Sequence, residues 1–136
     1  MQELFEHTAD LGLRATSPDL NTLFAEMATC LTSAMLDNPE EVRPTTSREF
    51  SFQEQDREYL LFDWLRALLH HFESEELLFN RFEVAVVYGG LKATAWGEPL
   101  DRSRHQLSRE VKAVTYHQLV VRATPEGWLA EAIVDI

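Results

Sequence analysis

The stretch from residue 57 to residue 73 restricts the fold of this chain more than any other. Its apolar side chains recur at the three- and four-residue spacing of a single helix face. They are Leu60, Leu61, Trp64, Leu65, Leu68, Leu69 and Phe72. Acidic residues at its start, Asp56 and Glu58, suit the positive end of a helix dipole. Because such a helix must bury its apolar face against another layer, we expect it to be the main core helix.

A second amphipathic helix is predicted from Leu20 to about Met35. Its start follows Ser17-Pro18-Asp19, a turn and helix-start signal, and its end comes before Asp37-Asn38-Pro39. Its apolar positions again share one face. They are Leu20, Leu23, Phe24, Met27, Ala28, Leu31 and Met35.

The remainder of the chain favours β-strands. Apolar and polar residues alternate on both sides of Gly89-Gly90, which predicts a hairpin there. Strands are predicted, in chain order, at residues 3–7, 11–16, 48–53, 82–88, 91–95, 116–123 and 128–135. We therefore expect one α+β domain over residues 1–136. Its mostly antiparallel sheet is built from both chain ends, with the two main amphipathic helices packed on it.

Residues 110–117, Glu-Val-Lys-Ala-Val-Thr-Tyr-His, also alternate, as in a strand with two different faces. Lys112 stands between apolar neighbours, where an unpaired charge is costly. Its ammonium therefore either reaches solvent at the rim or faces an anion. On spacing alone, a solvated strand face is favoured.

The charge balance narrows the classes of function. The formal net charge is −11, and no cluster of Lys and Arg offers a grip on a phosphate backbone, so strong direct nucleic-acid binding is disfavoured. Acidity suits cation capture or docking onto a basic partner. A single cysteine, Cys30, excludes a disulfide framework within the chain. With no signal-peptide pattern and no apolar run near the roughly 20 residues of a membrane span, we expect a cytoplasmic protein without membrane contact.

Short catalytic motifs are absent from the sequence. It contains no phosphate-binding glycine loop, no Gly-x-Ser-x-Gly elbow and no His-Glu-x-x-His. His7, His105 and His117 each lie in or beside a polar cluster. For any one of them alone, a hydrogen-bonded structural histidine is the favoured interpretation.

Two aspartates are candidate ligands for a cation. Asp10 sits where two predicted strands meet, and Asp135 follows the apolar run 132–134. A carboxylate so bracketed by apolar residues needs a cation or a hydrogen-bond donor. If the first and last strands are neighbours, Asp10, Asp135 and the α-carboxylate of Ile136 form an all-oxygen cluster, which suits Ca²⁺ or Mg²⁺ rather than zinc. On spacing alone, however, a turn-capping Asp10 and a solvated Asp135 are favoured.

Several longer strings carry a family resemblance. They are His7-Thr-Ala-Asp-Leu-Gly12, Leu61-Phe-Asp-Trp-Leu65, Phe79-Asn-Arg-Phe-Glu-Val84, Gly97-Glu98, Asp101, His105, Glu110 to His117 and Ile133-Val-Asp-Ile136. Together they resemble the archease family, in the same order and over essentially the whole chain. The likeness is looser across residues 36–56, and Ser17 stands where many relatives have glycine.

The resemblance implies a function and a site. Archeases are small cytoplasmic accessory proteins of the RtcB-type RNA ligase, which joins tRNA exon halves in tRNA splicing and repairs broken RNA. They promote guanylylation of the ligase's active-site histidine, so that it turns over repeatedly, and can broaden its nucleotide use. The family's metal site falls on Asp10, Asp135 and Ile136, and its lysine on Lys112. The chain would then be an activator, not an enzyme.

Three histidines complete the expected site. We expect His7, like Lys112, to contact the partner or a phosphate, with His105 and His117 in supporting positions. Two other classes of function stay open. One is a metal-dependent hydrolase that uses the Asp10–Asp135 cluster, although the ligand set is sparse and no general base is evident. The other is a chaperone-like modulator of RNA-processing enzymes.

Overall fold

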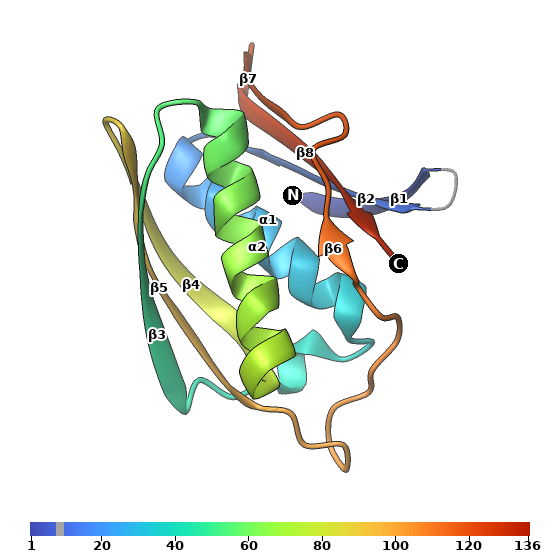
Figure 1. Cartoon of the computed structure of the whole chain (residues 1–136). Coiled ribbons are helices and arrows are strands. Elements are labelled where there is room, and N and C mark those ends of the chain that lie inside the picture. The colour runs from blue at the N-terminus through green and yellow to red at the C-terminus, as the bar shows by residue number, and fades with distance from the viewer. Residues whose placement is uncertain (8–9) are drawn as a thin grey trace.

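The computed structural model of the chain describes residues 1–7 and 10–136, and at residues 6 and 7 the description covers the backbone alone. Two helices lie between two antiparallel sheets (Figure 1). The elements in chain order are β1 (Gln2–His7), β2 (Asp10–Ser17), α1 (Leu20–Met35), a 3₁₀ turn (Pro39–Glu41), β3 (Thr46–Gln53), α2 (Arg57–Glu75), β4 (Leu77–Val87), β5 (Gly90–Pro99), β6 (Ala113–Val114), β7 (Val120–Thr124) and β8 (Gly127–Asp135).

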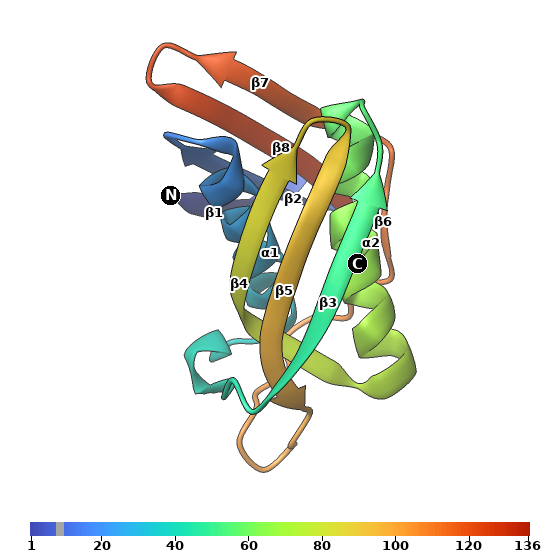
Figure 2. The same ribbon diagram turned by 90° about the vertical axis from the view of Figure 1, so that its left-hand side faces the viewer.

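The larger sheet joins the two ends of the chain. Its strand order is β1-β2-β8-β6, and β7 also pairs with β8. The α+β class and the antiparallel sheet built from both chain ends are thus confirmed. The prediction did not separate out a second sheet, which has the order β3-β5-β4 and stands on the other side of the helices (Figure 2).

Both helices begin at aspartate caps. Asp19 accepts a hydrogen bond from the Thr22 N–H at 2.8 Å, and Asp56 accepts one from the Glu58 N–H at 2.9 Å. A side-chain oxygen at this position satisfies an N–H group that the helix leaves unpaired. The two helices are tied together in the core, where the buried Trp64 indole donates to the Phe24 carbonyl at 2.9 Å. The prediction that α2 is the main core helix is not confirmed, because the shorter α1 has nine buried residues and α2 has seven.

The hairpin predicted at Gly89-Gly90 is confirmed. Strands β4 and β5 pair in antiparallel register up to Val87 and Gly90. Gly89 has a φ of 78°, a left-handed conformation that glycine adopts without steric cost. Tyr88, beside it at the tip, is 98% exposed.

The prediction for residues 110–117 was wrong in extent. Only Ala113 and Val114 form a strand, β6, which pairs with residues 134–135 of β8. A turn follows, with Gln118 at φ 51°, so β7 begins at Val120 rather than at residue 116. Strands β6 and β7 use successive parts of the same β8, and the chain between them must leave the sheet.

Among the described residues, no helix has both the length and the apolar character needed to span a bilayer.

Candidate functional site

Asp10 and Asp135 are cross-strand partners at one end of the larger sheet. The antiparallel register of β2 and β8 pairs Asp10 with Asp135, Leu11 with Val134 and so on along the strands. Alternation buries Leu11 and turns Asp10 to the other face of the sheet, where both aspartates are partly exposed. The last strand therefore lies beside an N-terminal strand, as predicted, although this neighbour is β2 rather than the first strand, β1. The register of β2 and β8 brings the two aspartates together.

This pairing leaves two negative charges facing each other. Directly opposite side chains on a sheet have Cβ atoms about 5 Å apart, and like charges there are destabilising. Among the described residues, neither carboxylate takes part in an ion pair. A hard cation would relieve the repulsion, and carboxylate oxygens are the ligands it prefers. The pair thus fits the predicted metal as the protein's part of a site.

The protein's own ligand set is small. Within the described part of the chain, no group of three or more His, Cys, Asp or Glu side chains is arranged to hold a metal ion. The prediction adds one further anionic group, the carboxylate of Ile136. This residue directly follows Asp135 and is 41% exposed. Because Ca²⁺ takes six to eight oxygens, water or a partner would supply the others.

The Phe5 ring and the Arg14 side chain pack together beside the aspartates, at positions two and four residues along β2 from Asp10. The Phe5 ring lies so close over Gly12 that a Cβ there would sit 2.2 Å from the ring. The Arg14 guanidinium lies 4.3 Å above the Phe5 ring centroid and pairs with Glu3 at 2.7 Å. It also forms an ion pair with Glu131 on β8. This stack fixes β1 to the β2–β8 pair that carries the aspartates.

Two of the predicted histidines, His7 and His117, remain predictions. The His7 side chain lies outside the described residues, although its backbone pairs with Asp10. His117 is exposed, and its N–H donates to the Thr115 hydroxyl at 3.1 Å. Its supporting position therefore stays a prediction.

His105 is a structural histidine. It is buried, its Nδ1 accepts from the Asp101 N–H at 2.9 Å, and its Nε2 lies 3.0 Å from a Glu98 oxygen. The 100–108 loop that carries it lies at the lower end of both ribbon views, away from the C-terminus (Figures 1 and 2). The structure does not bring His105 to the aspartates, and both of its ring nitrogens are used within the fold. The hydrogen-bonded alternative describes it.

Glu98 is the centre of this second polar cluster. Burial disfavours its charged form, but hydrogen bonds from the Arg43 N–H, Arg104 and His105 outweigh that effect and hold its pKa below the usual range. The Arg43 N–H donates at 2.8 Å. The cluster locks the loop onto β5 and needs no ligand to satisfy its charges.

Lys112 approaches the aspartates through its backbone. Its N–H donates to the Asp135 carbonyl at 2.8 Å. Its exposed side chain lines two depressions in the surface, and Glu73 of α2 lines both of them as well. Among the described residues it forms no ion pair. Lys112 therefore stands between the acidic pair and helix α2.

One of the two depressions lined by Lys112 was not predicted from the sequence. We call it the α2 groove. It has a volume of about 870 Å³ and runs between α2 and β6. Its lining includes Phe62, Asp63, Arg66, His70, Glu73, Lys112 and Tyr116. Because the two sides come from distant parts of the chain, no local spacing could have shown that they meet.

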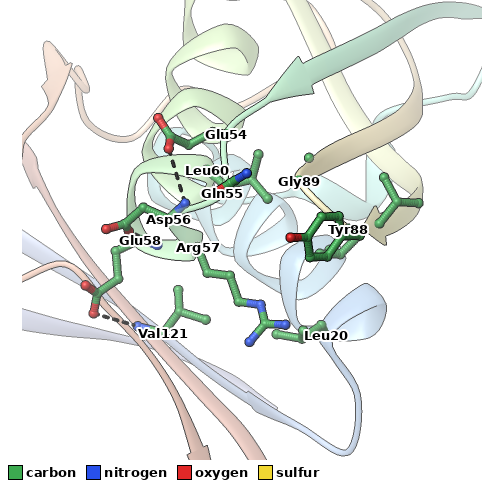
Figure 3. A pocket seen from close by; sticks show the side chains of 13 residues that line it. Leu20, Glu54, Gln55, Asp56, Arg57, Glu58, Leu60, Tyr88, Gly89 and Val121 are labelled. Atoms are coloured by element: carbon green, nitrogen blue, oxygen red, sulfur yellow. Dashed lines mark hydrogen bonds between the residues drawn. The ribbon is translucent and has the colours of Figure 1, made fainter.

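A further depression surrounds the start of α2, next to Tyr88 (Figure 3). Its carboxylates are already used within the fold. Glu54 accepts from the Asp56 N–H at 3.2 Å, and Glu58 accepts from the Val121 N–H at 3.3 Å. Asp56 caps the helix. These contacts account for the acidic residues, so we assign this depression no chemistry.

Comparison with known proteins places the chain in a family. Proteins named "Protein archease" from Sulfurisphaera tokodaii and Pyrococcus abyssi are 36% and 37% identical to it, over 98% of this chain and 97% of theirs. The solution structure of Methanobacterium thermoautotrophicum protein 1598 is 33% identical, with a TM-score of 0.86 over 99% of this chain and 98% of that one.

A more distant crystal structure shares the fold. It is that of a Thermotoga maritima protein described as an archease and possible chaperone, 18% identical with a TM-score of 0.64, over 100% of this chain and 98% of that one. The model of the Archease protein family (MTH1598/TM1083) matches residues 3–136, and the chain belongs to this family.

Proposed function

We propose that this protein is a cytoplasmic, metal-binding accessory protein of an RtcB-type RNA ligase. In this role it promotes guanylylation of the ligase and its multiple turnover in tRNA splicing and RNA repair. The observation that supports the proposal is the register that sets Asp10 opposite Asp135, with Ile136 next in the chain. Family membership supplies the context, and the like-charge pair supplies the chemistry.

The two aspartates and the Ile136 carboxylate would hold Ca²⁺ or Mg²⁺. Three carboxylates at one end of a sheet leave most of the cation's coordination positions open. A bound cation could therefore accept phosphate oxygens of a nucleotide at the ligase while the protein holds it. Since metal ions stabilise charge that develops on a transferring phosphoryl group, this placement suits guanylyl transfer.

The acidic surface fits this partner. With a net charge of −11, the chain is attracted to a positively charged, nucleotide-binding mouth. Lys112 stands beside the aspartates, its backbone N–H bound to Asp135. We assign its ammonium a contact with phosphate or with the ligase, and we assign His7 the same kind of contact.

Transfer of labelled guanylate from GTP to the purified ligase tests the function directly. We expect the protein to raise the rate of labelling at the ligase's histidine, and chelation of divalent ions to abolish the increase. A form with one residue added after Ile136 moves the terminal carboxylate and should stimulate less. Equal labelling with and without the protein would refute the proposal.

A chaperone-like role is the second candidate, and one observation favours it: the Thermotoga protein with this fold is described as a possible chaperone. In this case the protein would protect the ligase, or other RNA-processing enzymes, from inactivation. Heating the ligase with and without the protein separates the two roles. Protection that is retained by Asp135→Asn, without faster guanylylation, would favour the chaperone.

A further inference from the structure

The α2 groove contains an aromatic surface that is held in place and open to solvent. The Tyr116 ring stacks on Phe62, with the ring centroids 4.0 Å apart and the planes 18° from parallel. Tyr59 meets Tyr116 edge-on at 5.8 Å. Tyr116 is nevertheless 63% exposed, whereas Phe62 is 4% exposed. Although one face stacks on Phe62, most of the residue is exposed, so the ring can present surface to a flat ligand.

Two cations line the same groove. The Arg66 guanidinium lies 5.9 Å from the centre of the Phe62 ring, and Lys112 enters from the opposite wall. Neither forms an ion pair with any of the residues described. They are available to an anion.

Asp63 adds a polar group to the groove. Burial, reinforced by the nearby charge of Glu54, raises its pKa, and Arg66 opposes the shift. A half-buried carboxyl group next to an aromatic surface can bind ring N–H or amino groups. The groove thus combines a stacking face, hydrogen-bonding capacity and positive charge.

We infer that the α2 groove binds a mononucleotide, with the base on Tyr116 and the phosphate at Arg66 and Lys112. Aromatic side chains stack on bases through the π-face that every base has, and Arg and Lys bind phosphate oxygens. The groove's volume of about 870 Å³ lies within the 300–1,000 Å³ range typical of small-molecule sites. The inference does not depend on the ligase, because the isolated chain should bind.

A single nucleotide fits better than an RNA strand. Asp63 and Glu73 also line the groove, so its charge is balanced rather than strongly positive. A polyanion would meet the net charge of −11 beyond the groove. One phosphate group needs only the two local cations.

Amide NMR shifts of the isolated protein test the inference, with nucleoside 5′-monophosphates as probes. We expect shifts at residues 62–70 and 112–116, and weaker binding of the nucleoside without phosphate and of inorganic phosphate alone. Tyr116→Leu should weaken binding about tenfold, as loss of one base–aromatic stack does. Arg66→Gln should also weaken it, with most of its effect lost when the nucleoside replaces the nucleotide.

Matched variants control for general effects. Tyr88→Leu removes another exposed tyrosine, at the β4–β5 tip, and Arg81→Gln removes another arginine placed over an aromatic ring, Trp96. Both should bind as the parent does. Shifts outside the groove, or binding that Tyr116→Leu leaves unchanged, would overturn the inference. A short single-stranded RNA that binds more tightly than any mononucleotide would overturn the assignment of the occupant.

Discussion

Asp10 and Asp135 lie directly opposite each other across the antiparallel pair of β2 and β8. The two residues come from opposite ends of the chain, and the register of the two strands brings them together. Like charges in this position oppose folding. A cation that binds the pair converts this cost into binding free energy, and this conversion underlies the metal site we propose.

The first prediction concerns metal-dependent stability. Asp10→Asn and Asp135→Asn should each abolish stabilisation by Ca²⁺ or Mg²⁺. In the parent, a cation at one hundred times its Kd should add about 2.7 kcal/mol to the free energy of unfolding. Without metal, each variant should be about 0.2–1 kcal/mol more stable than the parent, because the repulsion is gone. Thermal unfolding with and without each cation measures both effects.

Glu83→Gln provides the control for this experiment, since it neutralises an exposed acid on β4, in the other sheet. It should leave the cation effect intact. If neither cation changes the Tm of the parent protein, the proposed metal site is contradicted. Variants that lose structure by circular dichroism would show that the aspartates hold the fold instead.

The second prediction concerns Lys112, for which the chain offers one matched control, its only other lysine, Lys92. Lys112→Ala should leave the Tm and the cation affinity close to the parent's and reduce guanylylation of the ligase strongly. Lys112→Arg should recover only part, because a planar fork does not replace a compact point charge. The control variant Lys92→Ala, on β5, should stimulate guanylylation of the ligase as much as the parent does. If both alanine variants stimulate alike, Lys112 is a solvated side chain.

The same lysine shows what its sequence could and could not reveal. Helical periodicity predicted α1 and α2 well, because each helix packs one continuous face, and Gly89-Gly90 marked its hairpin. Around Lys112, alternation over a few residues predicted a long strand. The structure instead buries Val111 and Val114 and pairs only two residues with β8. Alternation does not reveal how many residues of a neighbouring strand remain free to pair.

The candidate site was predicted to a similar degree. The sequence could raise the pairing of the two aspartates only as a condition on strand order, and the register of β2 and β8 meets that condition. The α2 groove could not be predicted, since Phe62 and Tyr116 meet only in the tertiary structure. His105 resembled a site residue in the sequence, and only its hydrogen bonds to Asp101 and Glu98 show its structural role.

The third prediction uses the Glu98 cluster. Glu98→Gln should cost about 2–4 kcal/mol near pH 7, because it leaves Arg104 and His105 without their buried acceptor charge. The folded protein holds the pKa of Glu98 below its usual value. Its contribution is therefore complete above the unfolded pKa of about 4.3 and is lost as the pH falls through the folded value.

Urea unfolding across pH measures this effect. The difference between parent and Glu98→Gln should be constant at neutral pH and shrink in acid. Glu40→Gln, at an exposed position, should show no such difference. A gap that widens in acid would mean that the glutamate is bound as the neutral acid.

The fourth prediction concerns the packing beside the aspartates. Gly12→Ala should destabilise the fold by about 1–3 kcal/mol, since a Cβ there would lie 2.2 Å from the Phe5 ring. In a Phe5→Leu background the same change should cost less, because the ring is gone. A double-mutant cycle by chemical denaturation measures the coupling. Independent effects of the two changes would show that the Phe5 ring does not fill the space above Gly12.

The most direct measurement of the central claim counts ligation turnovers per ligase molecule, with the cognate RtcB-type ligase, GTP and a divalent cation. The parent protein should convert a ligase that stops after about one turnover into one that joins RNA repeatedly. Asp10→Asn and Asp135→Asn, folded and equally concentrated, should not, whereas Glu83→Gln should match the parent. Full stimulation by both aspartate variants would contradict the account, as would a ligase whose turnover number ignores the parent protein.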